Sequence, residues 1–243
     1  MIITTLHYNR PDCTRRCLEA LSRCRGIEDC RLIAHTDGGP NRSQEVADLL
    51  QQRPFCDTQV CFHPDHLGFD QATFQTLRDG FVDADFVVHI EDDILLAPDA
   101  LEWFAWARDR YRDDQTVLSV SGLNREDAPP DRHHAASRRP WFAPWSWATW
   151  ADRWSVLREV IGKVTPGAPG YVGWDTAVLN HRNATGQCEV FPVLGRAQNI
   201  GSVSSIHSPD WFTPEWHHAN HHVEKWAGDG REVSQGTWEE VAS

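Results

Sequence analysis

Three consecutive carboxylates, Glu91, Asp92 and Asp93, directly follow a short apolar run over residues 86–90. Adjacent carboxylates repel one another, so a chain that places them at the end of a buried strand needs a compensating cation. The run is typical of a strand in a parallel sheet, and ligands of such sheets bind beyond the carboxyl ends of the strands. The triplet therefore predicts a point where a metal and a phosphate-bearing ligand meet. The alternative is a solvated turn after the strand.

Polar residues follow the other expected strands in the same way. They are Tyr8, Asn9 and Arg10 after the first strand, Asp37 and Gly38 after the second, and His66 and Gly68 after the third. Each group alone is weak evidence for a binding site, since a sequence such as Asp-Gly-Gly-Pro is also typical of an ordinary turn. Together they predict a nucleotide site, with a carboxylate for the base or ribose, a cation near the phosphates and acids that hold Mn²⁺ or Mg²⁺. Such a metal neutralises charge on a leaving diphosphate.

Strand-like and helix-like segments alternate through the first half of the chain at the spacing of βα units. The expected strands are 2–7, 31–35, 58–62, 86–90 and 117–120, and the expected helices are 11–23, 42–52, 69–81 and 98–111. This order predicts an α/β fold with a mainly parallel central sheet flanked by helices.

The texture changes after Gly122. Residues 124–140 are rich in Pro, Asp, Arg and His, which predicts a long loop. Residues 141–154 hold five of the twelve tryptophans. Their indole rings either pack in the core or present flat faces to a sugar ring or a nucleobase, and both interpretations stay open. Residues 228–243 are polar and are expected to be peripheral.

Composition narrows the class of protein. With 243 residues, 40% hydrophobic, and no run near the roughly 20 apolar residues of a membrane span, the chain is expected to be one α/β domain without such a span. The net charge of -12 argues against a generally basic nucleic-acid surface, although the basic cluster at 132–139 leaves a local one open. Seven cysteines without a Cys-x-x-Cys pair, and no signal-peptide pattern, favour reduced thiols and a cytoplasmic location.

The motifs Asn9-Arg10-Pro11, Asp37-Gly38, His66-Leu67-Gly68 and Glu91-Asp92-Asp93 together resemble those of glycosyltransferases of the GT-A fold, whose Asp-x-Asp-type motif binds metal and a nucleotide-sugar diphosphate. Gly173-Trp174-Asp175 and the segment 192–201 are similar to N-acetylglucosaminyltransferase I and to related bacterial and phage sugar transferases. The resemblance covers about residues 1–207, and the Trp-rich stretch matches the bacterial relatives better. It implies one GT-A-like catalytic domain over 1–227, with a nucleotide-sugar-binding half at 1–121, an acceptor-binding half at 122–227 and a polar tail at 228–243.

The resemblance also implies a role for individual residues. Asp93 would bind the metal directly with Asp92 beside it, His207 would close over the metal or phosphates, and Asp175 would be the general base. The implied nucleotide-sugar-binding residues are Tyr8, Asn9, Arg10, Asp37, Gly38, His66, Gly68, Glu91, Asp92 and Arg196, and the implied acceptor-binding residues are Trp145, Trp147 and Trp174. The expected activity is hexosyl or N-acetylhexosaminyl transfer to a hydroxyl, metal-dependent and inverting, with a UDP-linked donor favoured.

The acceptor has several candidates. One is a hydroxymethylated pyrimidine in phage DNA, in the host cytoplasm, because an enzyme that acts on a base in duplex DNA flips it against aromatic side chains. Another is a cell-surface glycan precursor. Alternatively, the chain is a non-catalytic carbohydrate-binding protein of the same fold and has no acceptor. A nucleotidyltransferase is disfavoured because the first strand is not followed by a glycine-rich basic loop. The cluster His217–His222 has the i, i+4 spacing of zinc ligands but lacks an accompanying glutamate or cysteine pair.

Overall fold

The computed structural model describes residues 1–39, 42–52, 54–201 and 226–241. A nine-stranded sheet forms its centre, in the order β11-β7-β9-β6-β8-β4-β1-β2-β3. The strands are β1 (Ile2–His7), β2 (Arg31–Thr36), β3 (Asp57–Phe62), β4 (Phe86–Glu91), β6 (Val117–Ser121), β7 (Ala135–Arg139), β8 (Ser146–Trp150), β9 (Cys188–Pro192) and β11 (Glu239–Glu240). A separate pair joins β5 (Ile94–Leu96) to β10 (Ala197–Asn199). The α-helices are α1 (Pro11–Leu21), α2 (Ser43–Gln52), α3 (Phe69–Gly80), α4 (Ala100–Tyr111), α5 (Ala151–Ile161) and α6 (Trp174–Thr185).

The sheet is mixed but mainly parallel, as predicted. Five neighbouring strand pairs are parallel, and three are antiparallel. Strands β3, β2, β1 and β4 form one parallel block, so their carboxyl ends meet at one edge. This arrangement gathers the polar groups that follow β1, β2 and β4.

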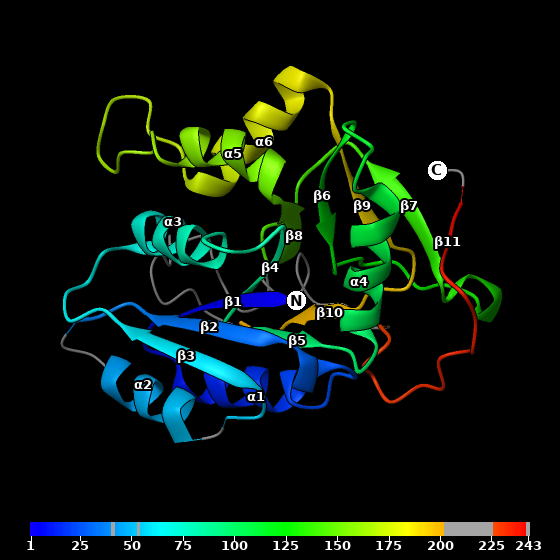
Figure 1. The fold of residues 1–243 in the computed structure, drawn as a ribbon, viewed down its shortest axis with the longest axis horizontal. Helices are drawn as coiled ribbons and strands as arrows, with labels where there is room; N and C mark the ends of the chain where they lie inside the picture. The colour runs from blue at the N-terminus through cyan, green and yellow to red at the C-terminus, as the bar shows by residue number, and fades with distance from the viewer. Residues whose placement is uncertain (40–41, 53, 202–225, 242–243) are drawn as a thin grey trace.

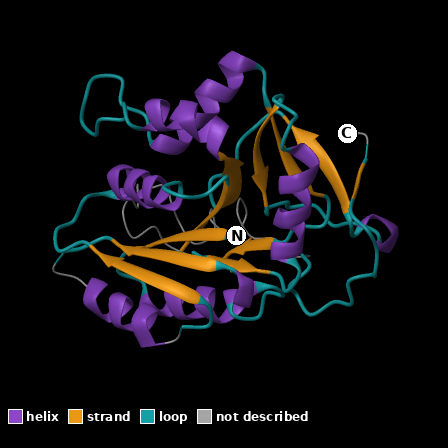
Figure 2. Cartoon of the chain, viewed as in Figure 1, coloured by secondary structure: helices purple, strands orange, loops and turns teal. Residues whose placement is uncertain are grey.

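Helices cover both faces of the parallel block (Figures 1 and 2). Helices α1 and α2 lie on one face, and α3 lies on the other with α5 and α6 beyond it. Helix α1 begins at Pro11, a residue suited to the first turn, and buries Cys17, Leu18 and Leu21 in the larger core. On the other side, Leu77 of α3 belongs to a second core with the tryptophans that follow β8. In the described part of the chain, no helix is both long and apolar enough to cross a membrane.

The region 124–140 is not the single long loop that its composition predicts. Residues Ala135–Arg139 of this region form β7, which pairs antiparallel with β9. Two arginines in this strand are neutralised by distant acids. Arg139 is buried against Glu189, and Arg138 lies 2.9 Å from the Asp114 carboxylate. These ion pairs stabilise two charged residues in a segment whose composition does not predict a strand.

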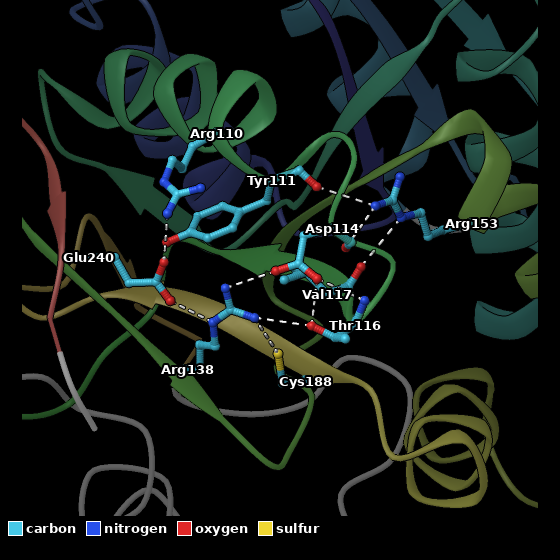
Figure 3. A network of polar contacts seen from close by, with 9 residues as sticks. All are labelled: Arg110, Tyr111, Asp114, Thr116, Val117, Arg138, Arg153, Cys188 and Glu240. Carbon is cyan, nitrogen blue, oxygen red and sulfur yellow. Dashed lines mark hydrogen bonds and ion pairs between the residues drawn. The ribbon is translucent and has the colours of Figure 1, made fainter.

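The end of the chain adds a two-residue edge strand to the sheet. Strand β11 pairs in parallel with β7, and Arg138 Nε donates to Glu240 at 2.6 Å (Figure 3). Trp238, just before β11, packs against Trp103 of α4 with ring centroids 4.7 Å apart. The segment is polar in composition, but one indole and one carboxylate fix it to the sheet.

Candidate active site

Arg10 and the acidic triplet meet at the carboxyl ends of β1 and β4. The two strands are parallel neighbours with Leu6 opposite Glu91, so the residues that follow them share one edge. Arg10 Nη1 lies 2.8 Å from Asp93 Oδ2, and Arg10 Nε donates to Asp92 Oδ2 at 3.4 Å. Arg10 Nη2 also contacts Asp92. The guanidinium therefore supplies part of the positive charge that the triplet needs.

The site nevertheless carries more negative charge than Arg10 balances. Burial raises the pKa of Glu91 well above its usual value, and the charge of Asp93 raises it further. Burial also raises the pKa values of Asp92 and Asp93, against the opposing effect of Arg10. Three buried carboxylates with elevated pKa values form an environment in which a second cation is strongly favoured.

The atoms of Asp93 fit a metal. Its side chain is buried, and among the residues that the structure describes none gives Oδ1 a hydrogen bond. Buried carboxylate oxygens normally have a partner, so an orphaned one beside two further acids suits a hard divalent cation such as Mn²⁺ or Mg²⁺. The chain after β10 closes around the same residue, because the Ile200 amide donates to the Asp93 carbonyl at 2.8 Å. At Gly201 a Cβ atom would lie 2.2 Å from Asp93 Oδ2, so a larger residue there would displace the Asp93 carboxylate.

Asp37 organises a second corner of the site after β2. Its carboxylate accepts hydrogen bonds from the amides of Leu67 at 2.7 Å and Gly68 at 3.1 Å, and it lies 2.8 Å from His66 Nδ1. The His66 ring stacks on Tyr8 with centroids 4.6 Å apart. Asp37 thus fixes the loop after β3 against the end of β2, and the His66–Tyr8 stack joins that loop to the loop after β1. The nucleotide contact expected of Asp37 stays a prediction.

Gly38 and Gly68 have separate backbone reasons to be glycine. A Cβ atom on Gly38 would lie 1.9 Å from the His63 carbonyl oxygen, because the loop after β3 crosses directly over it. Gly68 adopts a φ of 82°, in the left-handed region that favours glycine.

A small pocket joins these two corners. It is lined by Leu6, His7, Tyr8, Arg10, Asp37, Phe69, Glu91 and Asp92. Five of these residues were expected to bind a nucleotide sugar. The structure therefore brings groups from three strand ends and the start of α3 into one hollow.

Asp175 lies near the triplet. It lies in the first turn of α6, and it is near enough for its charge to raise the pKa of Glu91. The position is held by Asp70 of α3, which accepts hydrogen bonds from the Trp174 amide at 2.7 Å and from the Tyr171 hydroxyl. Sequence reasoning missed Asp70. Its one signal was an acid in the first turn of the helix that the sequence predicts over 69–81.

Three expected residues lie elsewhere. Arg196 is fully buried, paired with Asp99 at 3.0 Å and with the His133 carbonyl, so its guanidinium has a structural role and we leave it out of the site. Trp147 and Trp174 are 1% and 0% exposed and stack on each other in the second core. Their ring faces are covered in this structure, so the geometry favours core packing, and an acceptor platform at these two residues gains no support from it.

The remaining expected residues are placed as follows. Trp145 is partly exposed, with the Arg125 guanidinium 5.7 Å from its ring centroid. Asn9 is partly exposed between Tyr8 and Arg10. His207 and the cluster His217–His222 lie outside the described residues.

No protein-family model and no curated protein matches the chain. Solved structures do match it. The mannosyltransferase PcManGT from Pyrobaculum calidifontis, in complex with GDP-Man and Mn²⁺, has a TM-score of 0.54 and 18% identity over 79% of this chain and 54% of that one. S. aureus TarS has a TM-score of 0.55 and 10% identity, over 83% of this chain and 36% of that one. The structure of S. aureus TarS 1-349 has a TM-score of 0.53 and 9% identity, over 81% of this chain and 59% of that one.

All three matches are at 18% identity or less. The chain spans between 36% and 59% of their own lengths. The resemblance to N-acetylglucosaminyltransferase I is not tested by these matches and stays a prediction. At such low identity the likeness concerns the fold alone, and this chain shares with these structures an α/β fold with a mainly parallel central sheet flanked by helices.

Proposed function

We propose that this chain is a metal-dependent glycosyltransferase that moves a sugar from a nucleotide-diphosphate donor to an acceptor hydroxyl, with inversion at the anomeric carbon. The observation that carries the proposal is the buried Asp93 Oδ1, which has no hydrogen-bond partner among the described residues. It belongs to a cluster whose negative charge exceeds that of Arg10. The neighbour solved with GDP-Man and Mn²⁺ supports the same combination of metal and donor.

The pocket suits the nucleotide part of such a donor. Tyr8 and His66 offer stacked rings next to the Asp37 carboxylate, which is the pairing of flat surface and acceptor that a base and ribose require. Arg10 is charged and partly exposed between this corner and the triplet, where the diphosphate would lie. Asp93, with Asp92, would hold the divalent cation, and that cation would withdraw negative charge from the departing diphosphate.

Asp175 is the proposed general base. Its carboxylate would accept the proton from the acceptor hydroxyl while the acceptor oxygen attacks the anomeric carbon. The bond from that carbon to the diphosphate oxygen breaks, and its electron pair leaves with the nucleotide. A single in-line displacement inverts the configuration. The hydrogen bonds from Trp174 and Tyr171 to Asp70 hold the start of α6, and with it Asp175, in place.

Nothing in the described site favours a DNA acceptor. The basic residues Arg138 and Arg139 are paired with acids rather than available to phosphates, and Trp147 is in the core. We therefore propose that the acceptor hydroxyl belongs to a glycan and that residues of the second half, 122–227, bind this acceptor. A UDP-linked donor and a cytoplasmic location remain part of the proposal.

Donor turnover tests the proposal directly. Purified protein is mixed with UDP- or GDP-sugars, Mn²⁺ or Mg²⁺ and simple glycan acceptors, and free nucleotide and product mass are measured. We expect nucleotide release that requires the metal and is lost in Asp93→Asn and in Asp175→Asn. Asp12→Asn, an exposed acid of the adjoining α1, is the matched control and should retain activity. Release that is metal-independent, or that survives in Asp93→Asn, would contradict the proposal.

A further inference from the structure

A second group of metal-ligating side chains lies on the face of the sheet that α3 covers. His35 in β2 and Cys61 in β3 are directly opposite each other in the parallel register, so their side chains emerge on one face. Asp79 comes from the last turn of α3, which packs over β1 and β2. One ligand atom from each of the three residues lies within 4.8 Å of the others.

The orientation of His35 suits a ligand. The ring is fully buried, and its Nδ1 lies 2.9 Å from His63 Nε2. The other nitrogen, Nε2, faces Asp79 Oδ2 at 3.4 Å, and within the described part of the chain it has no hydrogen-bond partner. Metal-binding histidines commonly use one ring nitrogen for the metal while a neighbour fixes the other, and His63 is placed for that second task.

Asp79 and Cys61 complete the set. Arg78 pairs with Asp79 Oδ1 at 2.9 Å, which leaves Oδ2 directed at His35. Asp79 lies at the C-terminal end of a helix, where the helix dipole disfavours negative charge, so a cation beside it would relieve that conflict. Cys61 is partly exposed, which gives an ion a route of entry.

We propose that His35, Cys61 and Asp79 bind a divalent transition metal of the zinc class. Zinc accepts each of these three ligand types, a histidine nitrogen, a cysteine sulfur and a carboxylate oxygen, and three protein ligands leave a fourth position for water. Atoms no more than 4.8 Å apart lie within about 2.8 Å of a common point, so contraction by about 0.5–0.8 Å reaches zinc–ligand distances. On binding, the Cys61 thiol releases its proton to solvent and the thiolate forms the sulfur–metal bond.

This metal would tie the edge strand β3 to β2 and to the end of α3. The loop after β3 carries His63 and His66, and it crosses over Gly38 next to the Asp37 corner. The metal would therefore stabilise the support of the proposed nucleotide pocket without contacting the donor. It is distinct in residues and in ligand chemistry from the cation proposed at Asp93.

Cobalt substitution tests the site with a readout independent of turnover. Co²⁺ titrated into the whole metal-free protein should bind in a one-to-one ratio and produce a thiolate-to-cobalt charge-transfer band in the near ultraviolet. Zinc should displace it. The band should vanish in Cys61→Ser and persist in Cys56→Ser, the matched cysteine just before β3. It should also persist in Asp93→Asn, which separates this site from the proposed active site.

Thermal unfolding supplies the second measurement. Zinc at about a hundredfold excess over its Kd should raise the Tm of the wild type by about 5 to 10 °C and leave Cys61→Ser and Asp79→Asn unchanged. His63→Gln should weaken zinc binding about tenfold, as expected for a residue that orients a ligand. Absence of the band in the wild type, or a band that survives in Cys61→Ser, would overturn the proposal. If Cys61→Ser does not fold, loss of the band in Asp79→Asn decides the question, and its persistence there refutes the site.

Discussion

Replacing Arg10 by glutamine should destabilise the protein strongly, and a divalent metal should reverse most of the effect. The substitution keeps a polar side chain but removes the positive charge that faces Asp92 and Asp93. The two carboxylate side chains are 5% and 8% exposed, so water cannot replace the lost guanidinium. Arg10 is therefore the positively charged side chain that compensates the acidic triplet when no metal is bound.

The magnitude follows from the burial of the pair. Removing one partner of a buried ion pair costs about 3–5 kcal/mol, because the other charge is left unpaired. The Arg10 side chain is 22% exposed, which places the expected loss at the lower end, about 3 kcal/mol. Arg15→Gln, which removes only an exposed pair with Asp12, should cost less than about 1 kcal/mol.

Urea unfolding with and without Mn²⁺ measures both parts of this prediction. In metal-free buffer, Arg10→Gln should lose about 3 kcal/mol of unfolding free energy relative to the wild type. Mn²⁺ at about a hundredfold excess over its Kd should restore about 2.7 kcal/mol to the variant. A loss no larger than that of Arg15→Gln, or a variant that Mn²⁺ does not stabilise, would refute the reasoning about the triplet.

Three further predictions address positioning, packing and pH. Asp70→Ala removes the acceptor of the Trp174 amide, so kcat should fall about tenfold or more while donor Kd, measured by calorimetry, changes less than about twofold. Gly38→Ala should cost about 3 kcal/mol in urea unfolding, since the added carbon meets the His63 carbonyl. Burial lowers the pKa of His7 to about 3, so the unfolded chain takes up a proton near pH 6.5 that the folded chain refuses. Between pH 7 and pH 5 the wild type should therefore lose about 2 kcal/mol more unfolding free energy than His7→Gln, and equal losses would contradict this.

The first half of the fold could be predicted from sequence because each element carries its own signal there. The expected strand at 2–7 is β1, and the expected helix at 69–81 differs from α3 by one residue. The rule that parallel strands end at one edge then placed Arg10 and the triplet together. Local periodicity and this rule were sufficient for both results.

The second half could not be predicted because its order depends on partners distant in sequence. Strand β7 contains two arginines whose carboxylate partners lie 24 and 50 residues away in the sequence, and no local sequence pattern indicates either ion pair. Strand β11 has two glutamates and depends on its pairing with β7. The support of Asp175 by Asp70 spans about a hundred residues and is likewise invisible in the local sequence.

The central claim is that Asp93 controls metal and donor binding while Asp175 controls transfer. Calorimetric titration of the donor sugar nucleotide in the presence of Mn²⁺ tests it most directly, with wild type, Asp175→Asn and Asp93→Asn compared side by side. We predict that Asp175→Asn binds donor within about threefold of the wild type although its turnover falls by about a hundredfold or more. Asp93→Asn should show no metal-dependent donor binding. Donor binding by Asp93→Asn that matches the wild type in both affinity and metal dependence would contradict the account.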